Sequence, residues 1–484
     1  MKILRYGAIL KVLGVLLCII AFSMVLCIPF SIYYQTSHLS DFVSSIMICL
    51  FGGIVLLFAA RKMDQTVTKR EGYLIVFLAW ITLWIACALP YVLSGNMASI
   101  TDAFFETMSG LTTTGSTVIN DIEMWPRDIL FWRSFTQWLG GMGMIVLTVA
   151  LLPLLGIGGI ELFVAEAPGP TSEKLHPRIK DTAKSLWFIY LGLTLILWLI
   201  LWLLGMDWFD GINHALTTMA TGGFSTKNAS VAYFSPQIQY VIALFMFLGG
   251  VNYSLYYLAL RRKFSSVWSS DELRYYCFLI IGVAFAVTIL VFTSADITIE
   301  QAFRDSLFQV ISVVTTTGFV TADYTSWSPV LTAIFFILLF MGACAGSTSG
   351  GIKIIRHTVL FRNSILEFKR LLHPRAMIRL RLNGKIVPPR VLTHILVFFV
   401  LYIGTFAVGT VLVVMTGVDL ITAAGAVAAS IGNVGPGIGE VGPVNSYAPL
   451  SDITKWILAW LMLIGRLELF TVLIIFTPYF WINH

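Results

Sequence analysis

Long apolar runs follow one another along almost the whole chain, and short polar or basic stretches separate them. A helix that crosses a membrane needs roughly 20 consecutive apolar residues, and about ten of these runs approach that length. The first run, residues 9–34, is longer than the apolar core of a cleaved signal peptide, so we expect it to be retained as a helix. The pattern predicts an all-α, polytopic membrane protein without a sizeable soluble domain.

The charge distribution predicts how this chain lies across the membrane. Hydrophobic residues make up 58% of the 484 residues and charged residues only 12%, compared with about 25% charged in soluble domains. Most Lys and Arg residues fall in five stretches, which the positive-inside rule makes cytoplasmic together with both termini. The net charge of +6 therefore gives no reason to expect a nucleic-acid partner. The five stretches are residues 2–11, 61–70, 174–184, 261–274 and 353–390.

One plan is repeated four times between the basic stretches. Residues 1–70 predict a plain transmembrane hairpin, and each later unit has a long apolar segment, a shorter mixed segment, a glycine turn and a second long apolar segment. The mixed segment of about 12 residues makes roughly 18 Å of helix, which is too short to span a membrane but can enter it half-way. We predict four helix, pore-loop, helix repeats in a pseudo-fourfold arrangement around a central pore. Their ranges are 71–156, 185–261, 275–352 and 391–484, with a cytoplasmic basic segment at 353–390.

The four glycine turns predict a binding site for a cation. Irregular backbone at membrane depth is tolerated only where it is buried in protein or lines a cavity, and each helix C-terminus carries about half a negative charge. Glycine permits positive φ angles, and rings of carbonyl oxygens replace the hydration shell of potassium in known channels. One such turn alone would be an ordinary helix C-cap, whereas four in equivalent places favour a pore. The expected filter residues are Thr113, Thr114, Gly115, Thr221, Gly222, Gly223, Thr316, Thr317, Gly318, Asn433, Val434 and Gly435.

Seven motifs spread over the four repeats carry a family resemblance. They are DAFFETMSGLTTTG (102–115), FWRSFTQWLGGMGMIVL (131–147), TGGFST (221–226), TTTGF (315–319), GACAGSTSGGIK (342–353), NVGPG (433–437) and GRLELFT (465–471). On these motifs the chain resembles the Trk/Ktr/HKT potassium transporter superfamily, and most closely its bacterial TrkH-type membrane subunits. The fourth loop, SIGNVGPG, departs from the TTTG pattern because no threonine precedes its turn, and Gly435 is aligned by its place before Pro436.

The resemblance implies a function, partners and a location. It implies potassium as the transported ion, one glycine per loop favouring potassium over sodium, and transport across the bacterial inner membrane. It also implies a homodimer and a cytosolic nucleotide-binding regulatory ring similar to TrkA. NAD or ATP/ADP would then be bound only by that partner, and this chain would carry no cofactor.

The stretch GACAGSTSGG (342–351) interrupts the second apolar segment of the third repeat. Each glycine inside a helix costs about 1 kcal/mol relative to alanine, so a regular helix is not expected here. The resemblance implies an intramembrane gating loop, while the alternative is that the small residues allow helices to pack closely. The expected gate residues are Gly342, Gly346, Ser347, Thr348, Ser349, Gly350, Gly351, Lys353 and Arg466.

Arg466 stands in the apolar run 456–476, where an arginine costs about 2.5–3.5 kcal/mol on insertion scales. The resemblance favours an electrostatic barrier facing the pore, and the alternative is a structural ion pair. Glu468 lies two positions away and therefore not on the same helix face, so any partner comes from elsewhere.

Other charges leave two interpretations open. Residues Asp102, Glu106, His214 and Arg304 lie in or beside the predicted pore helices, where they either tune cation access or form structural pairs. The basic segment 353–390 is either an amphipathic interfacial helix near anionic lipid or a docking site for a soluble partner.

The sequence supports three classes of function to different degrees. The leading hypothesis is potassium uptake through a channel-like filter, gated by a cytosolic subunit. The alternative is a secondary transporter that couples potassium to sodium or proton movement, because broken helices also mark such folds. We do not expect an enzyme, because no nucleophile and base pair or transition-metal ligand set occurs at helical spacing in the predicted cavity-facing helices.

Overall fold

The computed structural model describes residues 6–63, 69–146, 179–294 and 296–481. Residues 147–156 of the first predicted repeat, and parts of three basic stretches, lie outside this range. The prediction of an all-α fold is confirmed. The described residues contain one small exception, a two-stranded hairpin of β1 (Arg381–Leu382) and β2 (Lys385–Ile386).

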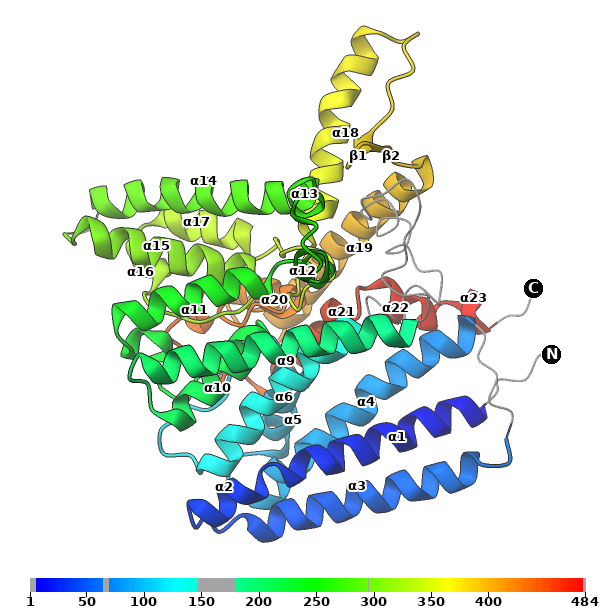
Figure 1. Ribbon diagram of the computed structural model, residues 1–484, viewed down its shortest axis with the longest axis vertical. Helices are drawn as coiled ribbons and strands as arrows, with labels where there is room; N and C mark the ends of the chain where they lie inside the picture. The colour runs from blue at the N-terminus through cyan, green and yellow to red at the C-terminus, as the bar shows by residue number, and fades with distance from the viewer. Residues whose placement is uncertain (1–5, 64–68, 147–178, 295, 482–484) are drawn as a thin grey trace.

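The N-terminal hairpin consists of α1 (Tyr6–Val25), α2 (Ile28–Tyr33) and α3 (Leu39–Ala60). Helices α1 and α3 lie side by side (Figure 1). Glycine allows this close approach, because a Cβ on either Gly14 or Gly53 would lie 2.9 Å from the carbonyl oxygen of the other. Two apolar helices thus pack through small residues, as is typical in lipid.

The helices that follow the hairpin recur in four sets. The first has α4 (Lys69–Ser94), α5 (Ile100–Leu111) and α6 (Arg127–Val146). The second has α9 (Ile179–Leu203), α10 (Trp208–Met219), η2 (Ser230–Tyr233), α11 (Pro236–Gly249) and α12 (Tyr253–Leu260), followed by α13 (Phe264–Trp268). The third has α14 (Asp271–Ser294), α15 (Ile299–Val314), α16 (Tyr324–Trp327) and α17 (Pro329–Leu338), followed by α18 (Ile354–Leu372). The fourth has α19 (Pro389–Val414), α20 (Leu420–Gly432), η3 (Gly439–Val441), α21 (Asp452–Arg466), α22 (Phe470–Leu473), η4 (Ile474–Phe476) and α23 (Pro478–Trp481).

In each set a short helix follows the first long helix, and these four helices begin in the same way. Helices α5, α10, α15 and α20 have 12, 12, 16 and 13 residues, close to the expected length of the pore helices. The side chain before each helix accepts a hydrogen bond from a backbone N–H of the first turn, which satisfies a group that has no partner within the helix. These N-caps are Ser99, Asp207, Thr298 and Asp419.

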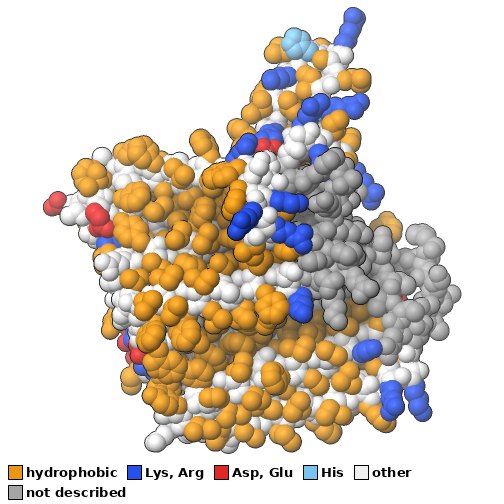
Figure 2. Space-filling model, in the orientation of Figure 1, with side chains coloured by type: hydrophobic (Ala, Val, Ile, Leu, Met, Phe, Trp, Pro, Cys, Tyr) orange, Lys and Arg blue, Asp and Glu red, His pale blue; other side chains and the backbone are white. Residues whose placement is uncertain are grey.

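The surface and the helix lengths are those of a membrane protein. Six helical segments of the described chain are long and apolar enough to cross a membrane: α1 with α2, α3, α4, α9, α14 and α19. Large apolar side chains point outward, and Phe22, Phe58 and Phe278 are 72, 76 and 79% exposed. Apolar side chains cover much of the body in Figure 2.

The second long helices predicted for the second and fourth repeats are not continuous, and that of the third repeat is interrupted as its sequence predicts. The pair α11 and α12 bends by 95°, and α21 bends by 107° against the segment Phe470–Phe476. Helix α17 stops at Leu338, and fifteen residues separate it from α18, which begins at Ile354. Gly250 at the first bend is closely packed, because a Cβ there would lie 2.4 Å from the Tyr276 hydroxyl and 2.9 Å from the Ala343 side chain.

The basic segment 353–390 forms α18 and the β hairpin, which project from the body (Figure 1). The hairpin turn is Asn383-Gly384, with positive φ at both residues, as in a two-residue type I′ turn. Asp271 at the start of α14 holds the turn, because its carboxylate accepts the Asn383 N–H at 2.7 Å and an Arg362 N–H at 2.8 Å. Lys and Arg side chains gather on this projection and on the adjoining end of the body (Figure 2).

Candidate functional site

The four short helices end in the same turn. The residue two positions before each aligned glycine donates its backbone N–H to the carbonyl oxygen three residues before itself. The residue directly before each aligned glycine donates its N–H to the carbonyl oxygen five residues before itself. This is the Schellman arrangement, in which one residue adopts the left-handed conformation. That residue is Thr113, Thr221, Thr316 or Asn433, with φ of 54, 52, 55 and 54°. The aligned glycines also have positive φ, of 86° at Gly115, 79° at Gly223, 79° at Gly318 and 99° at Gly435.

The threonines in the left-handed conformation concentrate backbone strain at three of the four turns. A β-branched residue with positive φ is uncommon, and such a conformation costs about 1–3 kcal/mol. Thr113, Thr221 and Thr316 are all fully buried, and Thr113 Oγ1 has no hydrogen-bond partner among the described residues. Strain of this kind persists only where the surrounding structure imposes it, which is typical of functional sites.

The four turns meet in a closed ring. A Cβ added to any of the aligned glycines would lie within 2.6 Å of a carbonyl oxygen of the next loop, closer than side chains pack. The contacts run from the first loop to the second, third and fourth, and from the fourth back to the first. The four distances are 2.3 Å from Gly115 to Gly222 O, 1.9 Å from Gly223 to Thr317 O, 2.1 Å from Gly318 to Val434 O and 2.6 Å from Gly435 to Thr114 O. The structure therefore places Gly435 in the same ring as the other three glycines.

A cavity of about 620 Å³ opens onto this ring. Its lining includes all four aligned glycines, the segments that follow them, and the polar side chains Asn120, Asn228 and Glu440. Four helix C-termini, each with a partial negative charge, thus end at the floor of a polar vestibule.

In the first three short helices, the side chain nine residues before the aligned glycine forms hydrogen bonds with the residues that follow this glycine. Glu106 accepts hydrogen bonds from Thr117 Oγ1 and Val118 N, both at 2.9 Å. His214 Nε2 lies 3.0 Å from Ser225 Oγ, and Gln309 Nε2 donates to a threonine hydroxyl at 3.4 Å. The fourth helix has alanine there, and its loop is held instead by the Tyr447 hydroxyl, 2.8 Å from Gly435 O.

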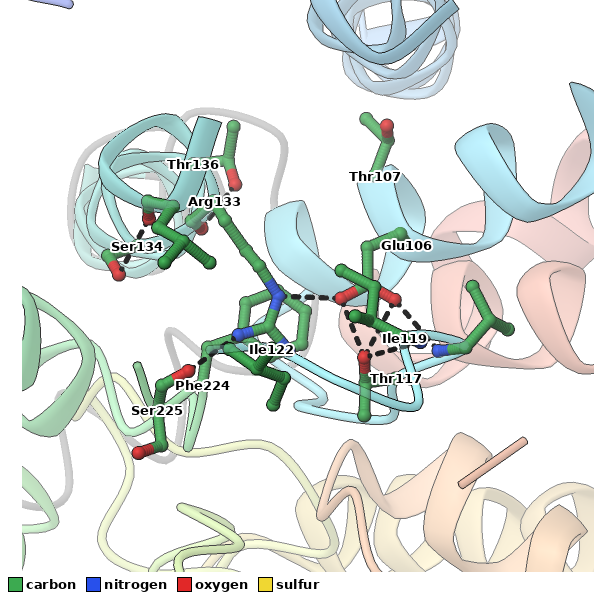
Figure 3. A network of polar contacts seen from close by, with 12 residues as sticks. Glu106, Thr107, Thr117, Ile119, Ile122, Arg133, Ser134, Thr136, Phe224 and Ser225 are labelled. Atoms are coloured by element: carbon green, nitrogen blue, oxygen red, sulfur yellow. Dashed lines mark hydrogen bonds and ion pairs between the residues drawn. The ribbon is translucent and has the colours of Figure 1, made fainter. Parts of the chain in front are cut away.

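Glu106 also forms a buried ion pair that joins the first two repeats (Figure 3). Arg133 of α6 donates through Nε to Glu106 at 2.7 Å and through Nη1 to Ser225 O at 3.0 Å, and its guanidinium lies 3.5 Å from the Phe224 ring centre. Glu106 is 0% and Arg133 2% exposed, so neither charge is solvated. The sequence interpretation missed Arg133, although a lone arginine in the apolar motif FWRSFTQW was a signal for it.

Breaking this pair is expected to destabilise the protein strongly. Arg133→Leu leaves the Glu106 carboxylate buried without its cation, which costs roughly 3–5 kcal/mol of unfolding free energy. The thermal unfolding midpoint of the purified protein in detergent measures the effect. Glu300→Gln is the matched control, because its side chain is 55% exposed and its pair with Arg304 is only partly buried, so the change should affect stability little. Equal midpoints for the two variants would contradict the prediction.

The other charges near the pore helices have described partners. Lys455 Nζ donates to Asp102 at 2.7 Å, and Arg304 lies 3.2 Å from Glu300. His214 Nδ1 lies 2.7 Å from the Asp210 carbonyl oxygen. The structure favours the paired interpretation of these residues over free charges facing the vestibule.

The segment 342–351 is an irregular loop that touches three of the four glycine turns. Gly350 N donates to Thr316 Oγ1 at 2.7 Å, and Thr221 Oγ1 donates to Thr348 Oγ1 at 3.1 Å. A Cβ on Gly350 would lie 2.6 Å from Gly432 O in the fourth loop. No helix covers residues 339–353 of the described chain, so the alternative of close helix packing through this stretch is wrong.

Two buried cations and one buried carboxylate hold this loop. Lys353 Nζ donates to the Ser349 carbonyl, and Arg466 donates to Thr348 O at 2.9 Å and to Gly140 O of α6 at 3.2 Å. Lys353 is 3% and Arg466 1% exposed. Glu272 of α14, which the sequence interpretation missed, accepts the Ala345 N–H at 2.6 Å.

The partners of Arg466 are backbone carbonyls. Within the described residues no carboxylate lies within ion-pair distance of it, and Glu468 instead pairs with Arg356 at 2.6 Å. The alternative of a structural ion pair therefore finds no support in the described structure. Arg466 places a buried positive charge against the loop that lies directly beside the ring.

Comparison with known proteins agrees with this geometry. The profile of the TrkH family, described as cation transport protein, matches residues 38–481. The Trk system potassium uptake protein TrkH of Escherichia coli K12 is 41% identical over 99% of this chain and 100% of its own length. TrkG of the same strain is 37% identical over 97% of both chains. The crystal structure of the potassium transporter TrkH from Vibrio parahaemolyticus superimposes with a TM-score of 0.92 at 38% identity, over 99% of this chain and 100% of that one. The chain belongs to the TrkH family of cation transport proteins.

Proposed function

We propose that the protein carries potassium into the cell through the ring of four loops. The observation that supports this most directly is the closed ring itself, in which four strained turns bring carbonyl oxygens together at the end of a polar vestibule. Such oxygens replace the hydration shell of potassium, and four helix C-termini favour a cation. Relatives named as Trk system potassium uptake proteins support potassium as the ion.

The proposal includes a gate and a regulatory partner. The loop 342–351, held by Lys353 and Arg466, closes the path next to the filter and opens when it moves away from the turns. The protein works as a homodimer in the bacterial inner membrane, with both termini in the cytoplasm. A cytosolic ring that binds NAD or ATP/ADP docks on the basic end that carries α18. The Trk system naming of the relatives supports a multi-component assembly.

Ion flux through the purified protein in proteoliposomes tests this function. With potassium, rubidium, sodium and lithium supplied in turn, we expect potassium and rubidium to pass and sodium and lithium to be largely excluded. Liposomes without protein give the background. Equal flux of all four ions, or no flux of any, would contradict the proposal.

A coupled secondary transporter is the second candidate, and the bent pairs of helices favour it. Potassium flux is therefore measured without sodium and with equal pH on both sides. Flux that persists supports the channel-like path. A requirement for a sodium or proton gradient supports coupled transport instead.

A further inference from the structure

The second filter loop differs from the others at the position just before its aligned glycine. The equivalent residues of the other loops are Thr114, Thr317 and Val434, and each has a side chain, whereas the second loop has Gly222. Gly222 has no positive φ, so the backbone conformation does not require glycine there. Something else must exclude a side chain at this place.

Gln137, which reaches in from α6, occupies the space. A Cβ on Gly222 would lie 2.4 Å from both Cδ and Oε1 of Gln137. The Gln137 amide also makes two backbone hydrogen bonds: Nε2 donates to Gly222 O at 2.6 Å, and Oε1 accepts from Phe224 N at 3.1 Å. The side chain is 0% exposed and bonds the residues on both sides of Gly223.

In the first and third loops a pair of threonines supplies the internal support that the second loop lacks. Thr112 Oγ1 lies 2.7 Å from Thr114 Oγ1, and Thr315 Oγ1 lies 2.7 Å from Thr317 Oγ1. The second loop has Ala220 and Gly222 at these places and cannot form a hydroxyl pair. Gln137 therefore replaces a support that the first and third loops build from their own residues.

The oxygen that Gln137 bonds is a member of the ring. Gly222 O is the atom that lies against Gly115 of the first loop. Selectivity between potassium and sodium, which carry the same charge, depends on the positions and number of such carbonyl oxygens. We propose that Gln137 is a specificity-determining positioning residue, which sets the place of the second-loop carbonyl and thereby favours potassium over sodium. This inference rests on the proposed potassium path.

The test compares potassium and sodium flux in proteoliposomes for two buried glutamines. Gln137→Leu keeps a side chain of similar size but loses both hydrogen bonds, and we expect the potassium to sodium ratio to fall by about tenfold. Gln239→Leu is the matched control, because Gln239 is also buried but donates to Phe234 O outside the ring. The potassium to sodium flux ratio of Gln239→Leu should equal that of the unchanged protein. An unchanged ratio in Gln137→Leu would overturn the inference.

A rescue variant separates positioning from space filling. Gln137→Ala combined with Ala220→Thr and Gly222→Thr gives the second loop the hydroxyl pair of the first loop. We expect this variant to recover most of the ratio, whether or not Gln137→Leu folds, and a ratio as low as that of Gln137→Ala alone would overturn the inference. If the unchanged protein and Gln239→Leu also pass sodium and potassium equally, the proposed function is what fails.

Discussion

Gly223→Ala is expected to reduce potassium flux at least about tenfold. The new Cβ would lie 1.9 Å from Thr317 O, and alanine at φ 79° is itself strained. Such strain costs roughly 1–3 kcal/mol, and each 1.4 kcal/mol corresponds to about a tenfold change in an equilibrium. The second and third loops must separate to relieve the contact, and the ring of oxygens opens with them. Potassium flux in proteoliposomes measures the loss.

Gly404→Ala is the control for this variant. Gly404 lies in α19 and has no neighbouring atom within 4 Å of its added Cβ, so the methyl group meets open space. We expect its flux to equal that of the unchanged protein. Both variants are compared at equal amounts of reconstituted, monodisperse protein. Full flux through Gly223→Ala would show that the ring is not the ion path.

Arg466→Ala is expected to raise potassium flux about tenfold or more without changing the order of ion preference. The substitution removes a buried positive charge held against the loop beside the ring, and such a charge repels a passing cation more strongly in a buried site than in water. It also removes the hydrogen bonds to Thr348 O and Gly140 O, so the loop 342–351, which we propose as the gate, is held less firmly. The loss of the charge and the loss of the hydrogen bonds are both expected to raise potassium flux. Unchanged flux would contradict the assignment of Arg466 to the gate.

Arg466→Lys distinguishes the charge from these hydrogen bonds. Lysine keeps the positive charge but lacks the planar, forked donors that reach two carbonyls at once. If the barrier is electrostatic, flux through this variant stays low. If the hydrogen bonds dominate, flux rises towards that of Arg466→Ala. The ratio of potassium to sodium is measured in the same vesicles, because a gate should leave it unchanged.

Much of this architecture can be predicted from short-range patterns in the sequence. The apolar runs determine which helices cross the membrane, and Ser99, Asp207, Thr298 and Asp419 cap the short helices that follow. The repeated glycines marked the four turns, and the positive φ expected at glycine occurs at all four. These features depend on interactions within a few residues, so they leave a pattern that can be read along the sequence.

The left-handed threonines and the hairpin show two limits of local interpretation. Threonine disfavours positive φ, so the propensity of Thr113 pointed away from the conformation that the fold imposes on it. The Asn-Gly pair at 383–384 was a usable turn signal, but strands of two residues were too short to show an alternating pattern.

The sequence by itself determined the helices, the number of turns and their glycines, whereas the tertiary structure decided which groups meet around them. Gln137 bonds Gly222 across 85 residues, and Arg466 bonds Thr348 across 118. In both contacts the acceptor is a backbone carbonyl, which every residue has. Such a partner leaves no mark in the sequence, so only the packing of α6 and α21 against the loops could identify it.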